Sequence, residues 1–419
     1  MGGRVPSPDF AYLMTKEYST ERAVNLGRAD VSRFTEQTPK ITAPDHESFM
    51  PDSGRPASET PLVSVIIPAY NAERFVARTL ESVLSQTYKN IEVLVVNDGS
   101  TDRTVEIVES FARKDSRIRI LHQPNLGAPA ARNCGIRSAK GEYIAPLDAD
   151  DIWHKEKIEA QVECFLRSSP SVGLVYSWSM IIDEKDNPLT GIAHEHGGNV
   201  LAELIYSNFV GNGSSPMIRR SCFQEVGDFN LHLQGGQDWD MYMRFAERYQ
   251  FQVIPKYHVG YRRVLNSISA DYENQDRCMA SVVDNFEERH PGIPKTLFRL
   301  SRSYTSFYMA GRASEAGRYM ASLGYLLRCL KLDPVRIVSS EYFLAMLKLL
   351  VRLTAKPVVA FLWNDPMVWE KVRRPLSSRF GRAPVVWDEM SVHRRPRLFD
   401  RIHNWRIARL KHRIMDGRS

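Results

Sequence analysis

The sequence has few cysteines, and they are poorly placed for cross-linking. The five cysteines lie far apart and form no CxxC pair; they are Cys134, Cys164, Cys222, Cys278 and Cys329. An odd, scattered set of this kind builds neither a disulfide framework nor a cysteine-rich zinc site. We therefore expect a protein of a reducing compartment, the cytoplasm.

The glycine-rich motifs that bind phosphate are also absent. No GxGxxG follows the first apolar run, and no GxxxxGK[ST] occurs anywhere in the chain. Those loops hold phosphates through backbone N–H groups. Their absence argues against a dinucleotide-dependent dehydrogenase and a P-loop kinase, so any bound phosphate needs another partner, such as a metal ion.

No apolar run has the length and purity of a membrane span. The longest candidate, residues 342–363, is interrupted by Lys348, Arg352 and Lys356, whereas a span needs about 20 mostly uncharged residues. Two interpretations of residues 341–419 stay open. One is an amphipathic, basic region that contacts the inner face of the cell membrane, and the other is packing on the rest of the protein. The first residues also lack the basic and apolar pattern of a secretory leader.

The composition is that of a soluble globular protein with more than one folded unit. The chain has 419 residues, 43% of them hydrophobic and 25% charged, and a single core rarely organises so many. The net charge of +7 fits phosphate-bearing ligands or anionic lipid and specifies neither. No nucleic-acid-binding module is recognisable, so we expect no nucleic-acid partner. We expect a loose arm at 1–60, a catalytic domain at 61–275, a helical extension at 276–365 and a basic tail at 366–419.

From residue 62 onward, apolar runs alternate with amphipathic stretches, which predicts an α/β fold with a parallel sheet and helices on both faces. The expected strands are 62–67, 91–96, 117–121, 143–147, 172–182 and 251–261. The expected helices are 73–86 with Asn71 as its N-cap, 101–113, 128–139, 154–167, 237–249 and several within 280–335. The stretch 183–235 reads as loop-rich.

Three polar segments follow three of the expected strands. They are Pro68-Ala69-Tyr70-Asn71, Asn97-Asp98-Gly99-Ser100 and Asp148-Ala149-Asp150-Asp151. Each alone is ordinary turn chemistry. Together at one sheet edge they indicate a ligand site, because ligands of open parallel sheets bind beyond the carboxyl ends of the strands.

Each segment has a chemical role available. The ring of Tyr70 can lie beside a base, and Asp98 can accept the imide N–H of uracil, which favours a uridine nucleotide. The acidic run concentrates negative charge that a hard cation such as Mg²⁺ or Mn²⁺ would neutralise, and such ions are shared with substrate phosphates. The alternative is a capped loop in which Asp150 or Asp151 begins a helix at Ile152.

Three longer segments resemble family 2 glycosyltransferases: residues 63–108, 127–151 and 235–244. The resemblance covers about residues 62–270. It implies the GT-A fold, a Rossmann-like, mostly parallel sheet flanked by helices, here with a C-terminal helical extension. It also implies an inverting transfer of a sugar from a nucleotide-diphosphate sugar to a hydroxyl of a glycan or lipid-linked acceptor, as in bacterial surface-polysaccharide synthesis.

The resemblance further implies residue roles. The nucleoside positions are Pro68, Ala69, Tyr70, Asn71 and Asp98; Arg132 lies near the nucleotide; Asp148-Ala149-Asp150 is the DxD motif, with Asp150 or Asp151 as the metal ligand. His258 is a third metal candidate, since some relatives use a histidine there, although a lone histidine in a strand is more often structural.

Asp238 is the candidate general base. It lies in Gln237-Asp238-Trp239-Asp240, where the family often has Glu before the Asp. An inverting transfer needs one carboxylate on the acceptor side. Asp240, two residues along a helix, points elsewhere, and Trp239 is better read as core. The alternative for Asp238 is a helix N-terminal carboxylate that the dipole favours. At the level of function, the alternatives are a sugar-nucleotide pyrophosphorylase and a non-catalytic binding module.

Overall fold

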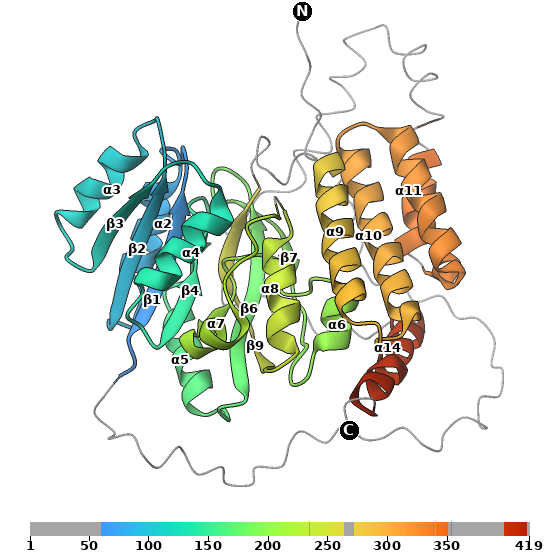
Figure 1. The fold of residues 1–419 in the computed structure, drawn as a ribbon. Coiled ribbons are helices and arrows are strands. Elements are labelled where there is room, and N and C mark those ends of the chain that lie inside the picture. The colour runs from blue at the N-terminus through green and yellow to red at the C-terminus, as the bar shows by residue number, and fades with distance from the viewer. Residues whose placement is uncertain are drawn as a thin grey trace, which may run out of the picture.

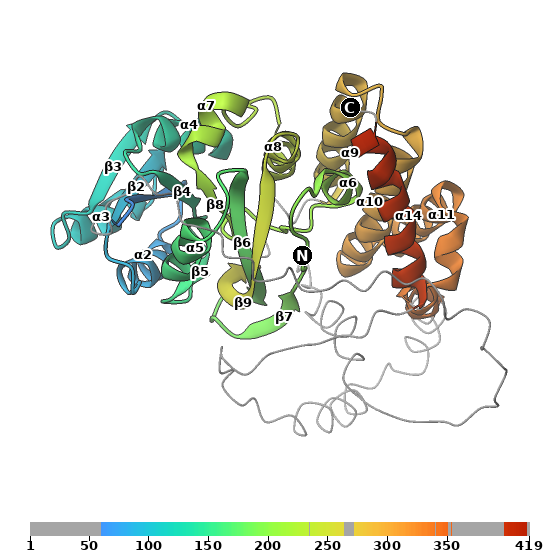
Figure 2. The ribbon, with the colours of Figure 1, turned by 90° about the horizontal axis from the view of Figure 1, so that it is seen from below.

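The computed structural model describes residues 60–233, 235–263, 272–339, 341–350, 353 and 398–416. The predicted N-terminal arm and most of the predicted basic tail lie outside these residues. In the described part, one curled sheet carries helices on both faces, and a second group of helices packs beside it (Figures 1 and 2).

The sheet has nine strands in the described part of the chain, in the order β3-β2-β1-β4-β8-β6-β9-β5, with β7 paired to β6. Their bounds are β1 Val63–Ala69, β2 Ile91–Asp98, β3 Ile118–Gln123, β4 Tyr143–Pro146, β5 Ile152–Trp153, β6 Val172–Ile182, β7 Pro188–Ile192, β8 Met217–Arg219 and β9 Gln250–Arg262. β3, β2, β1 and β4 are parallel, as are β6 and β9, whereas β8, β5 and β7 join antiparallel. The prediction of a mostly parallel sheet is confirmed.

The central strands are mostly apolar because helices cover both of their faces. The helices of the sheet domain are α2 Val76–Leu84, α3 Thr104–Ala112, α4 Ala128–Ser138, α5 Lys157–Leu166 and α8 Gln237–Ala246. On one face, Ile66 and Leu94 pack with Ile136 of α4. On the other, Val65 and Ile67 share a core with α2, α3 and α5.

One local expectation is wrong, and one of the alternatives does not hold. Asn71 is not a helix cap: α2 begins at Val76, while Asn71 has φ of 48° and its Oδ1 accepts the Thr101 N–H at 2.9 Å. The acidic run also does not begin a helix at Ile152, because Ile152–Trp153 pairs with β9 as a short strand and α5 begins only at Lys157.

The stretch predicted to be loop-rich contains four short elements. They are β7, β8, α6 Leu201–Tyr206 and α7 Arg220–Val226. Runs of three to seven residues are too short to show a clear hydrophobic period. Tertiary burial, as of Met217 and Ile218, fixes them instead.

The predicted helical extension is present. It comprises α9 Tyr272–Arg289, α10 Lys295–Glu315, α11 Tyr319–Leu332, the 3-10 helix η2 Pro334–Val338 and a helix at 341–350. The last helix, α14 Leu398–Asp416, lies within the predicted basic tail and packs on α6 and the extension (Figure 2).

One core joins the sheet domain to these helices. Trp239 of α8, Phe298 of α10 and Ile414 of α14 belong to the same buried cluster. Lys411 pairs with Glu203 of α6 at 3.0 Å. For residues 398–416 the contacts therefore favour packing, and among the described residues no helix has the length and apolarity to cross a membrane.

The close approach of α4 to β1 gives a stability prediction. A Cβ added to Gly135 would lie 2.4 Å from Ile66 Cγ2. The buried, β-branched side chain of Ile66 can move little to relieve this clash. We expect Gly135→Ala to lower the free energy of unfolding by about 1–3 kcal/mol.

Gly324→Ala on α11 is the matched control, since nothing lies within 4 Å of its added Cβ and alanine favours a helix by roughly 0.5–1 kcal/mol. Urea unfolding of both variants measures the difference. Equal stability of the two would contradict the packing described here.

Candidate active site

The acidic turn, which we define as Asp148 to Asp151, follows β4 and is fixed from two sides. On the α2 side, the Thr79 hydroxyl lies 2.8 Å from the carbonyl oxygens of both Ala149 and Asp151. On the other side, Ser214 Oγ accepts the Asp148 N–H at 3.0 Å and donates to Asp151 Oδ2 at 2.5 Å. The turn is therefore held in place by side chains distant in sequence.

Asp151 is fully buried, and both of its oxygens have partners. Oδ1 accepts the backbone N–H of Arg262 at 2.8 Å, and Oδ2 accepts the Ser214 hydroxyl. Burial, followed by the charges of Asp150 and Asp148, raises the pKa of Asp151 well above its ordinary value. These contacts build the turn, so the prediction of a metal ligand at this position rests better on Asp150.

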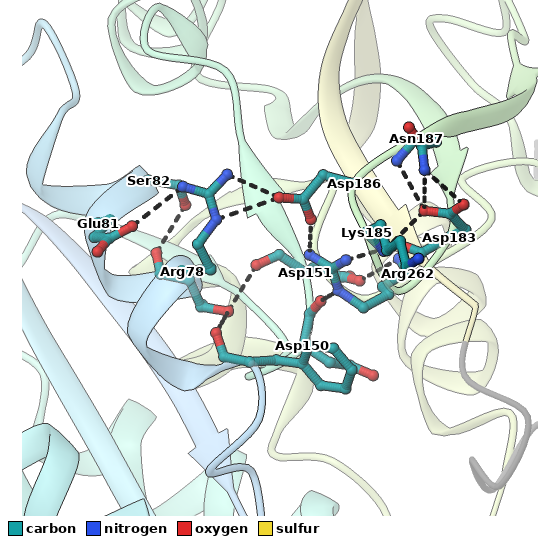
Figure 3. A network of polar contacts seen from close by, with 12 residues as sticks. Arg78, Glu81, Ser82, Asp150, Asp151, Asp183, Lys185, Asp186, Asn187 and Arg262 are labelled. Carbon is teal, nitrogen blue, oxygen red and sulfur yellow. Dashed lines mark hydrogen bonds and ion pairs between the residues drawn. The ribbon is translucent and has the colours of Figure 1, made fainter. Parts of the chain in front are cut away.

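Asp150 is the half-buried carboxylate of the turn. Burial and the neighbouring Asp148 raise the pKa of Asp150 to about 6, although Arg262 and Arg132 oppose the shift. Its backbone oxygen accepts Arg262 Nε at 2.6 Å, as Figure 3 shows. A carboxyl whose ionisation the surroundings oppose is one that a cation would stabilise.

Arg132 links the acidic turn to the predicted base. It comes from α4, its side chain is buried, and its Nη2 donates to Asp148 Oδ1. Burial opposes its charge, but Asp148 and then Asp238 raise the pKa of Arg132. Its Nε is buried without a hydrogen-bond partner among the described residues. The guanidinium therefore faces both carboxylates and keeps one donor for a further acceptor.

Asp238 lies in the first turn of α8 and interacts electrostatically with Arg132 and Asp148. Its Oδ1 accepts the Trp239 N–H at 2.9 Å, and its Oδ2 accepts Asn208 Nδ2 at 3.3 Å. Burial raises the pKa of Asp238 above its ordinary value, while Arg132 opposes the shift. A raised pKa is typical of a carboxylate that accepts a proton.

The neighbours of Asp238 behave as the sequence predicts. Asp240 points elsewhere and pairs with Arg244 at 2.9 Å and Arg289 at 3.3 Å. Trp239 is buried core, and its indole donates to the Leu204 carbonyl at 2.7 Å. Asp238, in contrast, interacts electrostatically with Arg132 and Asp148.

The predicted nucleoside positions gather at the ends of β1 and β2. Pro68 and Ala69 end β1, and Tyr70 is 51% exposed directly after them. Asp98 is buried and accepts three hydrogen bonds, from Gln123 Nε2 at 2.7 Å, Leu126 N at 2.9 Å and Gly127 N at 2.9 Å. A carboxylate has about four acceptor sites, so Asp98 holds the 124–127 loop and keeps one site for a ligand.

His258 lies in β9 away from these contacts. It is buried, its Nδ1 lies 3.2 Å from Ser177 Oγ, and its ring stacks on His154 at 5.7 Å. Burial, with Lys157 nearby, lowers the pKa of His258 to about 3. Within the described ranges, no three His, Cys, Asp or Glu side chains form a metal-binding group.

Residues that sequence reasoning did not assign complete the site. Ser214 holds the acidic turn, Asn208 holds Asp238, and Tyr242 donates to the Asn212 carbonyl at 3.0 Å. Asn212 to Ser215 lie in the stretch predicted to be loop-rich, yet Ser214 and Ser215 are fully buried. The run of small polar residues was the available signal, and its burial was not visible in the sequence.

The donor set fits a divalent ion that is shared with substrate. Asp148 and Asp150 supply hard oxygen ligands, and Mg²⁺ or Mn²⁺ is commonly held by one or two carboxylates together with phosphate oxygens. The raised pKa of Asp150 and the unpaired Nε of Arg132 are consistent with such a metal and phosphate pair.

Part of the chain matches a known protein family. Residues 64–227 match the sequence model of a family described as Glycosyl transferase family 2. That range contains Tyr70, Asp98, Arg132 and the acidic turn, whereas Asp238 lies beyond it.

The similar curated proteins are longer than this match. An uncharacterized glycosyltransferase of Rickettsia prowazekii is 35% identical over 192 residues, which is 44% of this chain and 59% of that relative. The chondroitin synthase of Pasteurella multocida is 29% identical over 262 residues, 62% of this chain and 26% of that protein. The chain covers between 31% and 59% of the length of four Rickettsia relatives.

Among solved structures, the mannosyltransferase of Pyrobaculum calidifontis in complex with GDP-Man and Mn²⁺ is 19% identical, with a TM-score of 0.46, and the match covers 74% of this chain and 90% of that one. A likeness of this size carries no weight beside the family match. Residues 64–227 therefore match glycosyl transferase family 2, the family that the sequence resembles.

Proposed function

We propose that the chain transfers a sugar from a nucleotide-diphosphate sugar to a hydroxyl of a glycan or lipid-linked acceptor, with inversion at the anomeric carbon. One observation carries the proposal: the buried Arg132 pairs with Asp148 of the acidic turn and also interacts electrostatically with Asp238. A leaving-group side and a base side therefore belong to one site.

The donor side comprises the nucleoside positions and the acidic turn. Tyr70 offers an exposed ring to the base, and the remaining acceptor site of Asp98 favours the imide of uracil. Asp148 and Asp150 would hold Mn²⁺ or Mg²⁺ against the diphosphate. When bound, that ion offsets the negative charge that develops on the leaving diphosphate.

The acceptor side centres on Asp238. Its carboxylate takes the proton of the acceptor hydroxyl while the new C1–O bond forms and the bond from C1 to the diphosphate oxygen breaks. The leaving diphosphate keeps the electron pair of that bond. Because burial raises the pKa of Asp238, its carboxylate binds a proton more readily than an exposed aspartate does.

The same proposal extends to the rest of the chain. Residues 61–275 form the catalytic domain, and 276–365 and 366–419 form its helical extension and basic tail. The enzyme works in the cytoplasm, and a lipid-linked acceptor would bring it to the inner face of the membrane. From residue 371 onward, Lys and Arg outnumber Asp and Glu by about three to one, which favours an anionic surface.

A donor panel tests the reaction. We expect the full chain to release nucleoside diphosphate from UDP-sugars in preference to GDP- and dTDP-sugars, with stimulation by Mn²⁺. Full release in excess EDTA would overturn the metal-assisted version. Pyrophosphate release from UTP and a sugar phosphate would instead support a pyrophosphorylase.

Asp238→Asn tests the base. The amide cannot accept the proton, so we expect kcat to fall by about 10²–10⁴-fold while the donor KM stays near the wild-type value. The wild-type rate should fall at acidic pH, as protonation of the raised-pKa carboxyl removes the base.

Asp240→Asn is the control, because Asp240 pairs with Arg244 and Arg289 instead. Its turnover per folded molecule should stay close to wild type. An Asp238→Asn enzyme that keeps more than roughly a tenth of its kcat would exclude Asp238 as the base.

Asp150→Asn tests the charge of the acidic turn. The pKa of Asp150 is raised to about 6, so its ionised form destabilises the folded state increasingly as the pH rises from about 4 to 6. In EDTA at pH 7.5 we expect the variant to be more stable by about 1–3 kcal/mol, with the gain vanishing near pH 4. Thermal melting at both pH values measures it.

Asp148→Asn is the contrasting variant on the same turn. It removes the charge partner of the buried Arg132, so its melting temperature should fall. Stabilisation by Asp148→Asn, or none by Asp150→Asn at pH 7.5, would show that the charges of the turn are balanced differently.

A further inference from the structure

Arg262, the last residue of β9, connects the acidic turn to the hairpin between β6 and β7. Its side chain is 1% exposed. Nε donates to the Asp150 carbonyl at 2.6 Å, Nη1 donates to the Asp183 carbonyl at 2.8 Å, and Nη2 pairs with Asp186 Oδ1 at 2.5 Å. Figure 3 shows the guanidinium between Asp150 and Asp186.

Asp186 is itself held in place. It lies in the hairpin turn with φ of 65°, a conformation that costs energy for most residues and that Asn and Asp tolerate best. From α2, Arg78 donates to its Oδ2 through Nη2 at 2.7 Å and Nε at 3.2 Å. Burial opposes its charge, but Arg78 and Arg262 hold the pKa of Asp186 below its ordinary value.

We propose that Asp186 is a positioning residue for the metal side of the site. Asp186 fixes the guanidinium of Arg262 against the backbone carbonyl of Asp150, and so leaves the carboxylate of Asp150 for the metal ion. This inference rests on the proposed function, in which the acidic turn binds the metal ion.

The physical argument concerns the choice of partner by a buried arginine. Arg262 already interacts electrostatically with the Asp150 carboxylate. Without the charge of Asp186, the Asp150 carboxylate is an anion that remains near Arg262, and a buried guanidinium needs a charged partner. A reoriented Arg262 would compete with the cation for Asp150, so metal affinity should fall although no proposed ligand has changed.

The hairpin offers a matched control. Glu184, two residues before Asp186, pairs with Arg74 near α2 at 2.7 Å. This ion pair also joins the hairpin to the region of α2, but it involves no atom of Arg262. Glu184→Gln therefore removes a tether of the same turn and leaves the Arg262 contacts intact.

The experiment measures Mn²⁺ binding rather than turnover. The full chain and its variants are titrated with Mn²⁺ by electron paramagnetic resonance at saturating UDP, and in a parallel series at saturating GDP. We expect Asp186→Asn to raise the Kd for Mn²⁺ by roughly tenfold, as loss of groups that orient metal ligands does. Glu184→Gln should stay within about twofold of wild type, because exposed ion pairs contribute little.

The outcomes separate this inference from the proposed function. Equal Kd values for wild type and Asp186→Asn, or equal weakening by both variants, overturn the positioning role while the metal site stands. A wild-type chain that binds no Mn²⁺ with either nucleotide overturns the metal site and this inference together.

A second variant covers loss of folding. If Asp186→Asn melts far below wild type, Arg78→Gln tests the positioning role instead. This substitution removes the α2 partner of Asp186 at an exposed position. It should weaken Mn²⁺ binding in the same direction by a smaller factor, and unchanged binding would refute the role of Asp186.

Discussion

The site depends on how the protein manages three carboxylates within four residues at the edge of its sheet. Asp148, Asp150 and Asp151 cannot all be ionised in a buried turn without cations nearby. Arg132 pairs with the Asp148 carboxylate, and Arg262 donates to the backbone of the turn at Asp150. The two arginines leave Asp150 incompletely compensated, as its raised pKa shows.

This arrangement explains why distant elements meet here. Arg132 is placed by α4, which packs against β1 and β2, and Arg262 is placed by β9, which pairs with β6 over ten positions. Asp238 is held near Arg132 by α8, which is anchored through Trp239 in the core shared with the C-terminal helices. The helical extension thus supports the base side of the site.

The central strands and the three polar segments were predictable because they are local patterns: continuous apolar runs, and polar residues where those runs end. The partners of the acidic turn were not, since Ser214 is 63 residues from Asp151 and Arg262 is 112 residues from Asp150. Asp150 and Asp151 are the same residue type side by side. Only its contacts with Ser214 and Arg262 identify Asp151 as the buried residue and leave Asp150 as the residue that faces the site.

Two residues of the site lack a partner of opposite kinds: one lacks a cation and the other lacks a hydrogen-bond acceptor. Asp150 has more negative charge around it than the protein neutralises, and Arg132 has a buried Nε without an acceptor among the described residues. A cation alone would neutralise Asp150 but would leave Arg132 Nε without an acceptor. A phosphate alone would accept from Arg132 but would leave Asp150 without a cation. A diphosphate that carries its own divalent ion answers both, since its oxygens can accept from Arg132 while the ion meets Asp150. The metal-bound diphosphate of the proposed reaction would therefore suit both residues better than either component alone.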